Sequence, residues 1–320
     1  MGIAVNFAIF ILSGFLLLKS AELFIKGALE ISLALRLSKV FIGATIVSLV
    51  TTSPELIVSV TSSAMGEVGL AVGNAIGSCI CNIGLVFAFG AILRDIKVER
   101  EDFNSKVGFL IAALIVVYFF ILDKKLDRKE AVILLILQAL FLGYNYHLAL
   151  KHRKQFKVDI PNAAENSNLL KKGFFLFLIG GIATVIIARY GLVSTGINIA
   201  RFLGVPPAVI GLSLIALGTS LPELFTTIVS SRKQHSDIAV GNIIGASILD
   251  LLLVLGVSAL VNPLTIDTQT LFFNMPSAMA ITLVMFFLGF KSLRFTRKKG
   301  IILLLVYLVY IAALFIAVYK

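Results

Sequence analysis

The sequence predicts an all-α polytopic membrane protein in which ten transmembrane helices form two inverted five-helix repeats. Composition is the first reason: 59% of residues are hydrophobic, 14% are charged, and the mean hydropathy is +1.03. Apolar runs long enough to cross about 30 Å of hydrocarbon recur along the whole chain. Two sequence blocks also recur at one fixed spacing on either side of a polar stretch. A soluble domain of this length needs far more polar surface, so that class is excluded.

Ten apolar runs are the predicted spans. They cover residues 4–26, 40–64, 69–93, 107–122, 131–150, 173–195, 206–230, 238–260, 271–290 and 300–319. The polar stretch at 151–172 divides them into two sets of five. We therefore expect a first five-helix repeat at 1–150, a cytoplasmic linker loop at 151–172 and a second, inverted five-helix repeat at 173–320.

The distribution of Lys and Arg predicts the orientation. Loops on the N-terminal side carry far fewer of these residues than the loops on the opposite side. Because basic loops stay in the cytoplasm, both termini are expected outside and the central loop inside, in the plasma membrane of a prokaryote. The net charge of +11 then reflects orientation in the lipid bilayer, and no nucleic-acid partner is expected.

Internal repetition is the second reason for the fold prediction. Residues 43–55 read GATIVSLVTTSPE and residues 211–223 read GLSLIALGTSLPE, while 73–82 read GNAIGSCICN and 241–250 read GNIIGASILD. A single shift of 168 residues, without a gap, aligns both pairs of blocks. Since five spans is an odd number, the second repeat must enter the membrane inverted. Inverted repeats are typical of secondary transporters, whose site lies near mid-membrane where the repeats meet.

Three acids inside apolar sequence are the first candidates for that site. Glu55 lies in the second predicted span, Glu223 in the seventh and Asp250 in the eighth. A carboxylate at that depth costs several kcal/mol unless it has a partner. The alternative is a set of protonated or hydrogen-bonded structural acids. Because Glu55 and Glu223 are related by the repeat, we favour a cation site.

Each of these glutamates directly follows a proline. Pro54 and Pro222 cannot donate to the carbonyls of Val50 and Gly218, which are released in the turn before the glutamate. Released carbonyls at membrane depth are tolerated where they line a cavity or hold an ion. Hydroxyl side chains occupy the same turns, at Thr51, Thr52, Thr219 and Ser220. A kink that only shapes the helix is the alternative interpretation.

The second pair of blocks predicts helices that pack closely. Their glycines are spaced four residues apart, which lets another helix approach. Asn74, Ser78 and Asn82 also recur every four residues and form a polar stripe. Such a stripe is commonly a packing contact. Facing a broken helix with a buried glutamate, it indicates ligands or groups that support them.

The chemistry of these candidate groups limits the ion. All are oxygen donors, which suit calcium, sodium or magnesium and not zinc or copper. Calcium fits best, because it takes six to eight oxygens, whereas magnesium usually keeps its waters. Cys79 and Cys81 are the only cysteines and lie within one apolar run, so no disulfide framework and no thiolate site is expected.

These blocks resemble the alpha repeats of the cation/calcium exchanger superfamily, specifically the sodium/calcium exchanger (antiporter) family. The resemblance implies calcium transport in exchange for sodium by alternating access, with no enzyme activity and no cofactor besides the transported ions. By matching position it implies metal ligands at Ser48, Thr51, Thr52, Glu55, Ser78, Asn82, Ala216, Thr219, Ser220, Glu223 and Asp250. Ser48 and Ala216 would offer backbone carbonyls, and the two glutamates would be the central calcium ligands.

The chain departs from the family pattern at two informative places. Val50 stands where the family has glycine, and Ala246 stands opposite Ser78, where a hydroxyl is usual. The counter-ion therefore stays open, and a proton/calcium antiporter is the alternative. Other classes considered are a channel and an intramembrane enzyme, although no GxGD-like motif is present. Stoichiometry and oligomeric state do not follow from the sequence.

Overall fold

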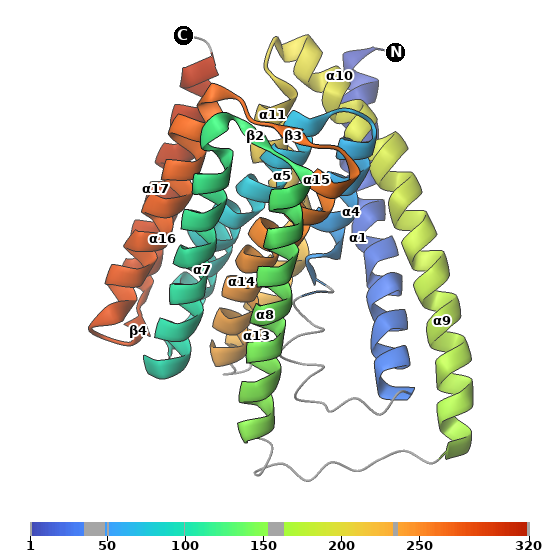
Figure 1. Cartoon of the computed structure of the whole chain (residues 1–320), viewed down its shortest axis with the longest axis vertical. Coiled ribbons are helices and arrows are strands. Elements are labelled where there is room, and N and C mark those ends of the chain that lie inside the picture. Colours follow the sequence, from blue (N-terminus) through green and yellow to red (C-terminus); the bar gives the residue numbers. More distant parts are fainter. Residues whose placement is uncertain are drawn as a thin grey trace.

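The computed structural model describes residues 2–34, 49, 51–98, 100–152, 163–232 and 236–318. The described residues form a bundle of long helices with only four two-residue strands (Figure 1). Seven of these helices are long and apolar enough to cross a membrane. The predicted class, an all-α polytopic membrane protein, is confirmed. The count of ten spans stays a prediction, because those expected at 40–64, 131–150 and 206–230 are not among the seven.

The first half of the chain supplies the elements from α1 to α8. They are α1 (Ile3–Ala34), α4 (Ser53–Ala64), α5 (Val68–Cys81), the π-helix η2 (Asn82–Phe87), α6 (Ala88–Leu93), β1 (Ile96–Lys97), α7 (Arg100–Phe120), the 3-10 turn η3 (Ile121–Asp123), β2 (Lys125–Leu126) and α8 (Arg128–His152). The helices α5, η2 and α6 follow one another without a break, so they form one continuous span.

The second half supplies the elements from α9 to α17. They are α9 (Ala163–Ile186), η5 (Ile187–Val193), α10 (Ser194–Leu203), α11 (Pro207–Ile210), η6 (Gly211–Ile215), α12 (Ala216–Thr219), α13 (Leu221–Arg232), α14 (Ser236–Leu249), η7 (Asp250–Val254), α15 (Leu255–Val261), β3 (Leu264–Thr265), η8 (Thr270–Asn274), α16 (Met275–Phe290), β4 (Arg294–Phe295) and α17 (Arg297–Val318). Here η5, η6, η7 and η8 are π-helical.

The sequence repeat is also a structural repeat. A shift of 168 residues carries both ends of α4 onto the ends of α13, and both ends of α5 onto the ends of α14. It also carries Asn82, where η2 begins, onto Asp250, where η7 begins. Matching backbone conformations at matching positions show that the two halves fold in the same way.

The short strands show that the second half is inverted. Strand β1 pairs with β4 and β2 pairs with β3, so each small sheet takes one strand from each half. The pairs Ile96↔Phe295 and Leu126↔Leu264 occupy equivalent places in the two sheets. Strands β2 and β3 lie at the end of the bundle that carries both termini, and β4 lies at the opposite end (Figure 1). Equivalent sheets at opposite ends require the two repeats to run in opposite directions.

Helix ends around the linker differ from the prediction. The polar stretch was expected to be a loop from 151 to 172, but α8 continues to His152 and α9 already begins at Ala163. The residues from 163 to 172 read AAENSNLLKK, and the Ala, Leu, Lys and Glu residues among them are good helix formers. Lys172 also pairs with Glu30 of α1 at 2.9 Å, which ties this extension to its neighbour. Residues 153–162 lie outside the described residues.

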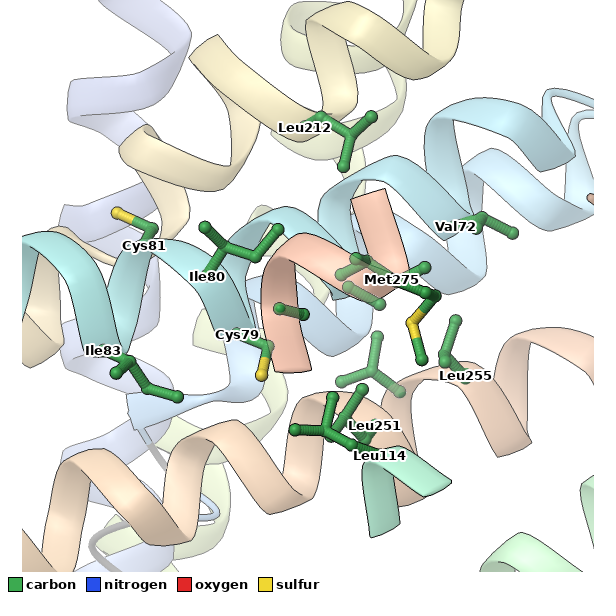
Figure 2. Packing of buried hydrophobic residues seen from close by; sticks show 14 of the residues in the cluster. Val72, Cys79, Ile80, Cys81, Ile83, Leu114, Leu212, Leu251, Leu255 and Met275 are labelled. Carbon is green, nitrogen blue, oxygen red and sulfur yellow. The ribbon is translucent and has the colours of Figure 1, made fainter. Parts of the chain in front are cut away.

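The apolar core lies around α5 and α14, the two helices of the glycine-containing blocks. Figure 2 shows Cys79 of α5 pointing toward Leu251 of η7, near residues of α7, α15 and α16. Cys79 and Cys81 are both buried and both free cysteines. Apolar side chains on α1, α9 and α17 are instead widely exposed, as lipid-facing surfaces must be.

Candidate cation site

Both glutamates lie just after a break between two helical segments. Helix α12 ends at Thr219, Ser220 turns the chain, and α13 starts at Leu221. In the first half Thr52 precedes α4 with φ −80° and ψ 0°, almost the same angles as Ser220, which has φ −80° and ψ 5°. Proline lacks a backbone N–H. It is tolerated in the first turn of a helix because an N–H at that position would have no intrahelical acceptor.

The break gives each glutamate a favourable position. Glu55 lies in the first turn of α4 and Glu223 in the first turn of α13. Helix N-termini carry partial positive charge, which stabilises a carboxylate that is held in the membrane. The two repeats thus present two carboxylates from the starts of two oppositely oriented helices.

Asp250 joins these two acids, and all three are buried. Glu55 is 1% exposed and the other two are 0% exposed. Each acid lies close enough to interact electrostatically with at least one of the others. The ion pairs found within the described residues involve Glu22, Glu30 and Asp95, and none of them involves these three acids. Three buried acids that have no ion-pair partner in the part of the chain that the structure describes need a bound cation or protons.

Asn82 and Asp250 mark the centre of the site. The amide of Asn82 donates to the Asp250 carboxylate at 3.2 Å. These residues are repeat counterparts, so a contact between them lies on the two-fold axis that relates the halves. Cys79 and Ser247 are counterparts too, and they also interact. The axis therefore passes between α5 and α14.

Hydroxyl side chains cross between the repeats around this axis. Ser78 of α5 lies 3.4 Å from the hydroxyl of Thr219. Ser220 donates to the Glu55 carboxylate at 3.4 Å. Thr219 lies beside Glu55, and its counterpart Thr51 lies beside Glu223. Each glutamate is thus flanked by a hydroxyl group of the other half.

Asn74 connects these pieces, although it was not among the predicted ligands. Its amide donates to the Glu55 carbonyl at 3.2 Å and to the Ser59 hydroxyl at 2.9 Å. Its carbonyl oxygen accepts a hydrogen bond from Thr219 at 3.2 Å. The polar stripe formed with Ser78 and Asn82 was the available signal. With both donors in use, Asn74 positions the site by joining α5, α4 and α12.

Several buried oxygens of the site have no hydrogen-bond partner. They are Thr52 Oγ1, Glu55 Oε2, Asn82 Oδ1, both Oε atoms of Glu223 and Asp250 Oδ1. An unsatisfied buried polar group costs about 1–3 kcal/mol, and more when it is charged. A hard cation coordinated by these oxygens removes that cost, and its preferred donors are carboxylate, hydroxyl and carbonyl oxygens.

The acids alone do not make a complete metal site. Within the described part of the chain, no three His, Cys, Asp or Glu side chains form a ready metal-binding group. Neutral oxygens must therefore complete the coordination. The Ala216 carbonyl accepts the Ser220 N–H at 3.1 Å and the Thr219 hydroxyl at 3.3 Å, so it already has two hydrogen-bond donors and would have to give one up to bind an ion. Ser48, the other predicted carbonyl donor, lies outside the described residues, as does Val50.

Comparison with known proteins agrees with the two-repeat organisation. The family described as "Sodium/calcium exchanger protein" matches residues 5–147 and 173–316, one stretch for each repeat. The chain belongs to the sodium/calcium exchanger family. The family predicted from the sequence is thereby confirmed. The two matched stretches leave out residues 148–172, which include the whole of the predicted linker at 151–172.

Relatives resemble this family member over nearly their whole lengths. The "Sodium/calcium exchanger MaX1" of Methanosarcina acetivorans is 32% identical over 98% of this chain and 99% of its own. The "Putative antiporter CaxA" of Alkalimonas amylolytica is 34% identical over 96% of this chain and 98% of its own. A solved structure of the sodium-calcium exchanger NCX_Mj, soaked with Na⁺ and Sr²⁺, matches with a TM-score of 0.67, 28% identity and coverage of 97% and 99%.

Proposed function

We propose that this protein is a secondary active antiporter that exchanges calcium for sodium across the membrane by alternating access. The observation that carries the proposal is the buried oxygen cluster at the two-fold axis. Glu55, Glu223 and Asp250 lie there with unsatisfied oxygens, and none of the ion pairs found among the described residues involves them. Membership in the exchanger family and the resemblance to NCX_Mj support sodium and calcium as the two exchanged ions.

Charge and ligand type favour calcium as the transported divalent ion. A calcium ion on the axis would lie between the Glu55 and Glu223 carboxylates, with Asp250 and Asn82 beside it. Calcium takes six to eight oxygens in flexible geometry, and the unsatisfied oxygens together with nearby hydroxyls can supply them. NCX_Mj was studied with strontium, a cation of the same charge and similar preference for oxygen ligands.

The same cluster explains why transport is an exchange. Three buried carboxylates repel one another when no cation is present, and hydrocarbon does not screen that repulsion. The protein with an empty site is therefore not expected to switch its opening from one side of the membrane to the other. Calcium or a set of sodium ions neutralises the acids, so a movement in one direction with calcium is followed by a return with sodium. The broken helices between the repeats support a site near mid-membrane.

The remaining assignments also belong to this proposal. Loop charge supports an orientation with both termini outside and the central loop in the cytoplasm. Relatives of similar length in bacteria and archaea support a prokaryotic plasma membrane. The protein acts without catalysing a chemical reaction, and its ions are its substrates.

Transport in reconstituted vesicles tests the function. Vesicles loaded with sodium are diluted into sodium-free medium that contains radioactive calcium, with the membrane potential held at zero. We expect rapid calcium uptake that stops when sodium is equal on both sides, and loss of uptake in Glu223→Gln. Uptake that follows a pH gradient and ignores sodium would establish the proton/calcium alternative. Uptake without any counter-ion would indicate a channel.

A further inference from the structure

The two-fold axis relates two sets of side chains, one on each side of it, which we call the first and the second compartment. In the first, Ser78 of α5 faces Thr219, which lies beside Glu55. The shift of 168 residues carries Thr219 onto Thr51, which lies beside Glu223. The same shift carries Ser78 onto Ala246 of α14. The second compartment therefore pairs Thr51 with a methyl group where the first pairs two hydroxyls.

The symmetry that places Ala246 there holds throughout the region. The helices α4 and α13 have equivalent ends, as do α5 and α14, and η2 and η7 start at equivalent residues. Counterparts also meet each other on the axis at Asn82 and Asp250. Because the backbones agree on both sides of position 246, the difference between the compartments lies in the side chain alone.

The adjacent Ser247 does not replace the missing hydroxyl. Ser247 is adjacent in sequence, but its hydroxyl donates to the carbonyl of Ile243 in its own helix at 2.9 Å. Its counterpart in the first half is Cys79, so its position corresponds to the axis contact and not to the compartment. Ala246 itself is 0% exposed. The second compartment is therefore short of one oxygen.

We propose that Ala246 makes the cation site one-sided, so that the protein exchanges fewer sodium ions per calcium than a site with two equal compartments would. This inference rests on the proposed sodium/calcium exchange and names the residue that sets its stoichiometry. Calcium on the axis is held mainly by carboxylates, which both halves supply. A sodium ion has half the charge, so its binding depends more strongly on each neutral oxygen.

The inference predicts what a single hydroxyl does at position 246. In Ala246→Ser, we expect one more sodium ion to be exchanged per calcium ion. The measured quantity is the ratio of internal to external calcium concentration at which net flux stops under a fixed sodium gradient. For a tenfold sodium gradient at zero membrane potential, that ratio should rise about tenfold. Calcium binding in the absence of sodium should change much less. An unchanged ratio in a folded, active variant would overturn the inference.

Matched variants protect this test against a folding defect. Ser78→Ala removes the hydroxyl from the first compartment and should lower the calcium ratio by about the same factor. The double variant Ser78→Ala with Ala246→Ser restores one hydroxyl pair on the opposite side and should return the ratio to its original value. If the double variant keeps the low ratio of Ser78→Ala, the compartments are not equivalent and the inference fails.

Calcium uptake by the wild-type protein distinguishes a failure of the proposed function from a failure of the inference about Ala246. If wild-type vesicles show no sodium-driven calcium uptake, the proposed function fails before stoichiometry is reached. If wild-type protein exchanges the two ions and Ala246→Ser leaves the stopping ratio unchanged, only the inference about Ala246 fails.

Discussion

The centre of the protein and its edge both contain a crossing of two helical segments related by the repeat. At the centre, α5 crosses α14 beside broken helices and three carboxylates. At the edge, α1 runs beside α9 and α10 (Figure 1). Two of their hydrogen bonds join neutral side chains, Ser20 with Thr184 at 3.0 Å and Asn6 with Asn198 at 3.0 Å. One ion pair, Lys172 with Glu30, also joins α9 to α1.

Small residues bring the helices together in both places. A Cβ atom on Gly77 would lie 2.7 Å from Leu212, and a Cβ atom on Gly180 would overlap the backbone of Phe24. Close approach alone therefore does not create an ion site. The centre adds acids at the starts of broken helices, whereas the edge carries no buried acid cluster and has the Lys172–Glu30 ion pair between α9 and α1. We infer that the centre holds the ions, and that a shift at the edge would disturb the Lys172–Glu30 ion pair but none of the buried acids.

The largest expected effect comes from removing one charge at the centre. Glu223→Gln keeps the size and most of the hydrogen-bonding capacity but removes a carboxylate beside the axis. Calcium flux should fall by about 100-fold or more, since losing even an outer partner of a metal site typically costs 10–100-fold. Glu55→Gln should behave alike, because the two-fold axis makes the residues equivalent. Near-normal calcium flux in either variant, measured in vesicles, would remove the proposed site.

A smaller loss is expected when only the positioning of the centre changes. Asn74→Ala removes three hydrogen bonds that join α4, α5 and α12 but leaves every proposed carboxylate in place. Calcium affinity should fall by about 10-fold to 100-fold. The matched control is Ser63→Ala. Ser63 also lies on α4 but away from the acids, and its buried hydroxyl donates a hydrogen bond to the Ser258 carbonyl of α15. Equal loss of affinity in both variants would mean a general packing defect.

A substitution at the edge should lower the stability of the protein and leave its calcium affinity nearly unchanged. Gly27→Ala places a methyl group against the backbone of α9, where a Cβ atom would lie 2.6 Å from the Gly173 carbonyl. Overpacking of this kind costs about 1–3 kcal/mol. Thermal unfolding in detergent should shift downward, while calcium affinity per folded molecule stays close to normal. Gly14→Ala is the control on the same helix, because nothing lies within 4 Å of its new methyl group.

Particular residues show how much of the fold and site was predictable. The fixed shift between the blocks predicted the equivalent helices α4 and α13, and it predicted that Glu55, Glu223 and Asp250 share one site. The role of Asn74 was missed because a polar stripe looks the same whether it binds an ion or joins helices. The π-helices at Asn82 and Asp250 were missed as well. One extra residue per turn leaves no mark in an apolar sequence, and packing against other spans decides it.

The smallest effect is expected at Asp127, which lies outside both crossings and precedes α8. Its carboxylate accepts the backbone N–H groups of Lys129 at 2.8 Å and Glu130 at 3.1 Å. These hydrogen bonds, the one from Glu130 above all, hold the pKa of Asp127 below its usual value. Because the folded pKa is lowered, the stabilisation is present above the unfolded pKa and is lost as pH falls through the folded pKa. Asp127→Ala should therefore lower the unfolding temperature slightly at neutral pH, and the difference should vanish in acid. Calcium transport should not change, so a transport defect in this variant would mean that the end of the bundle communicates with the central site.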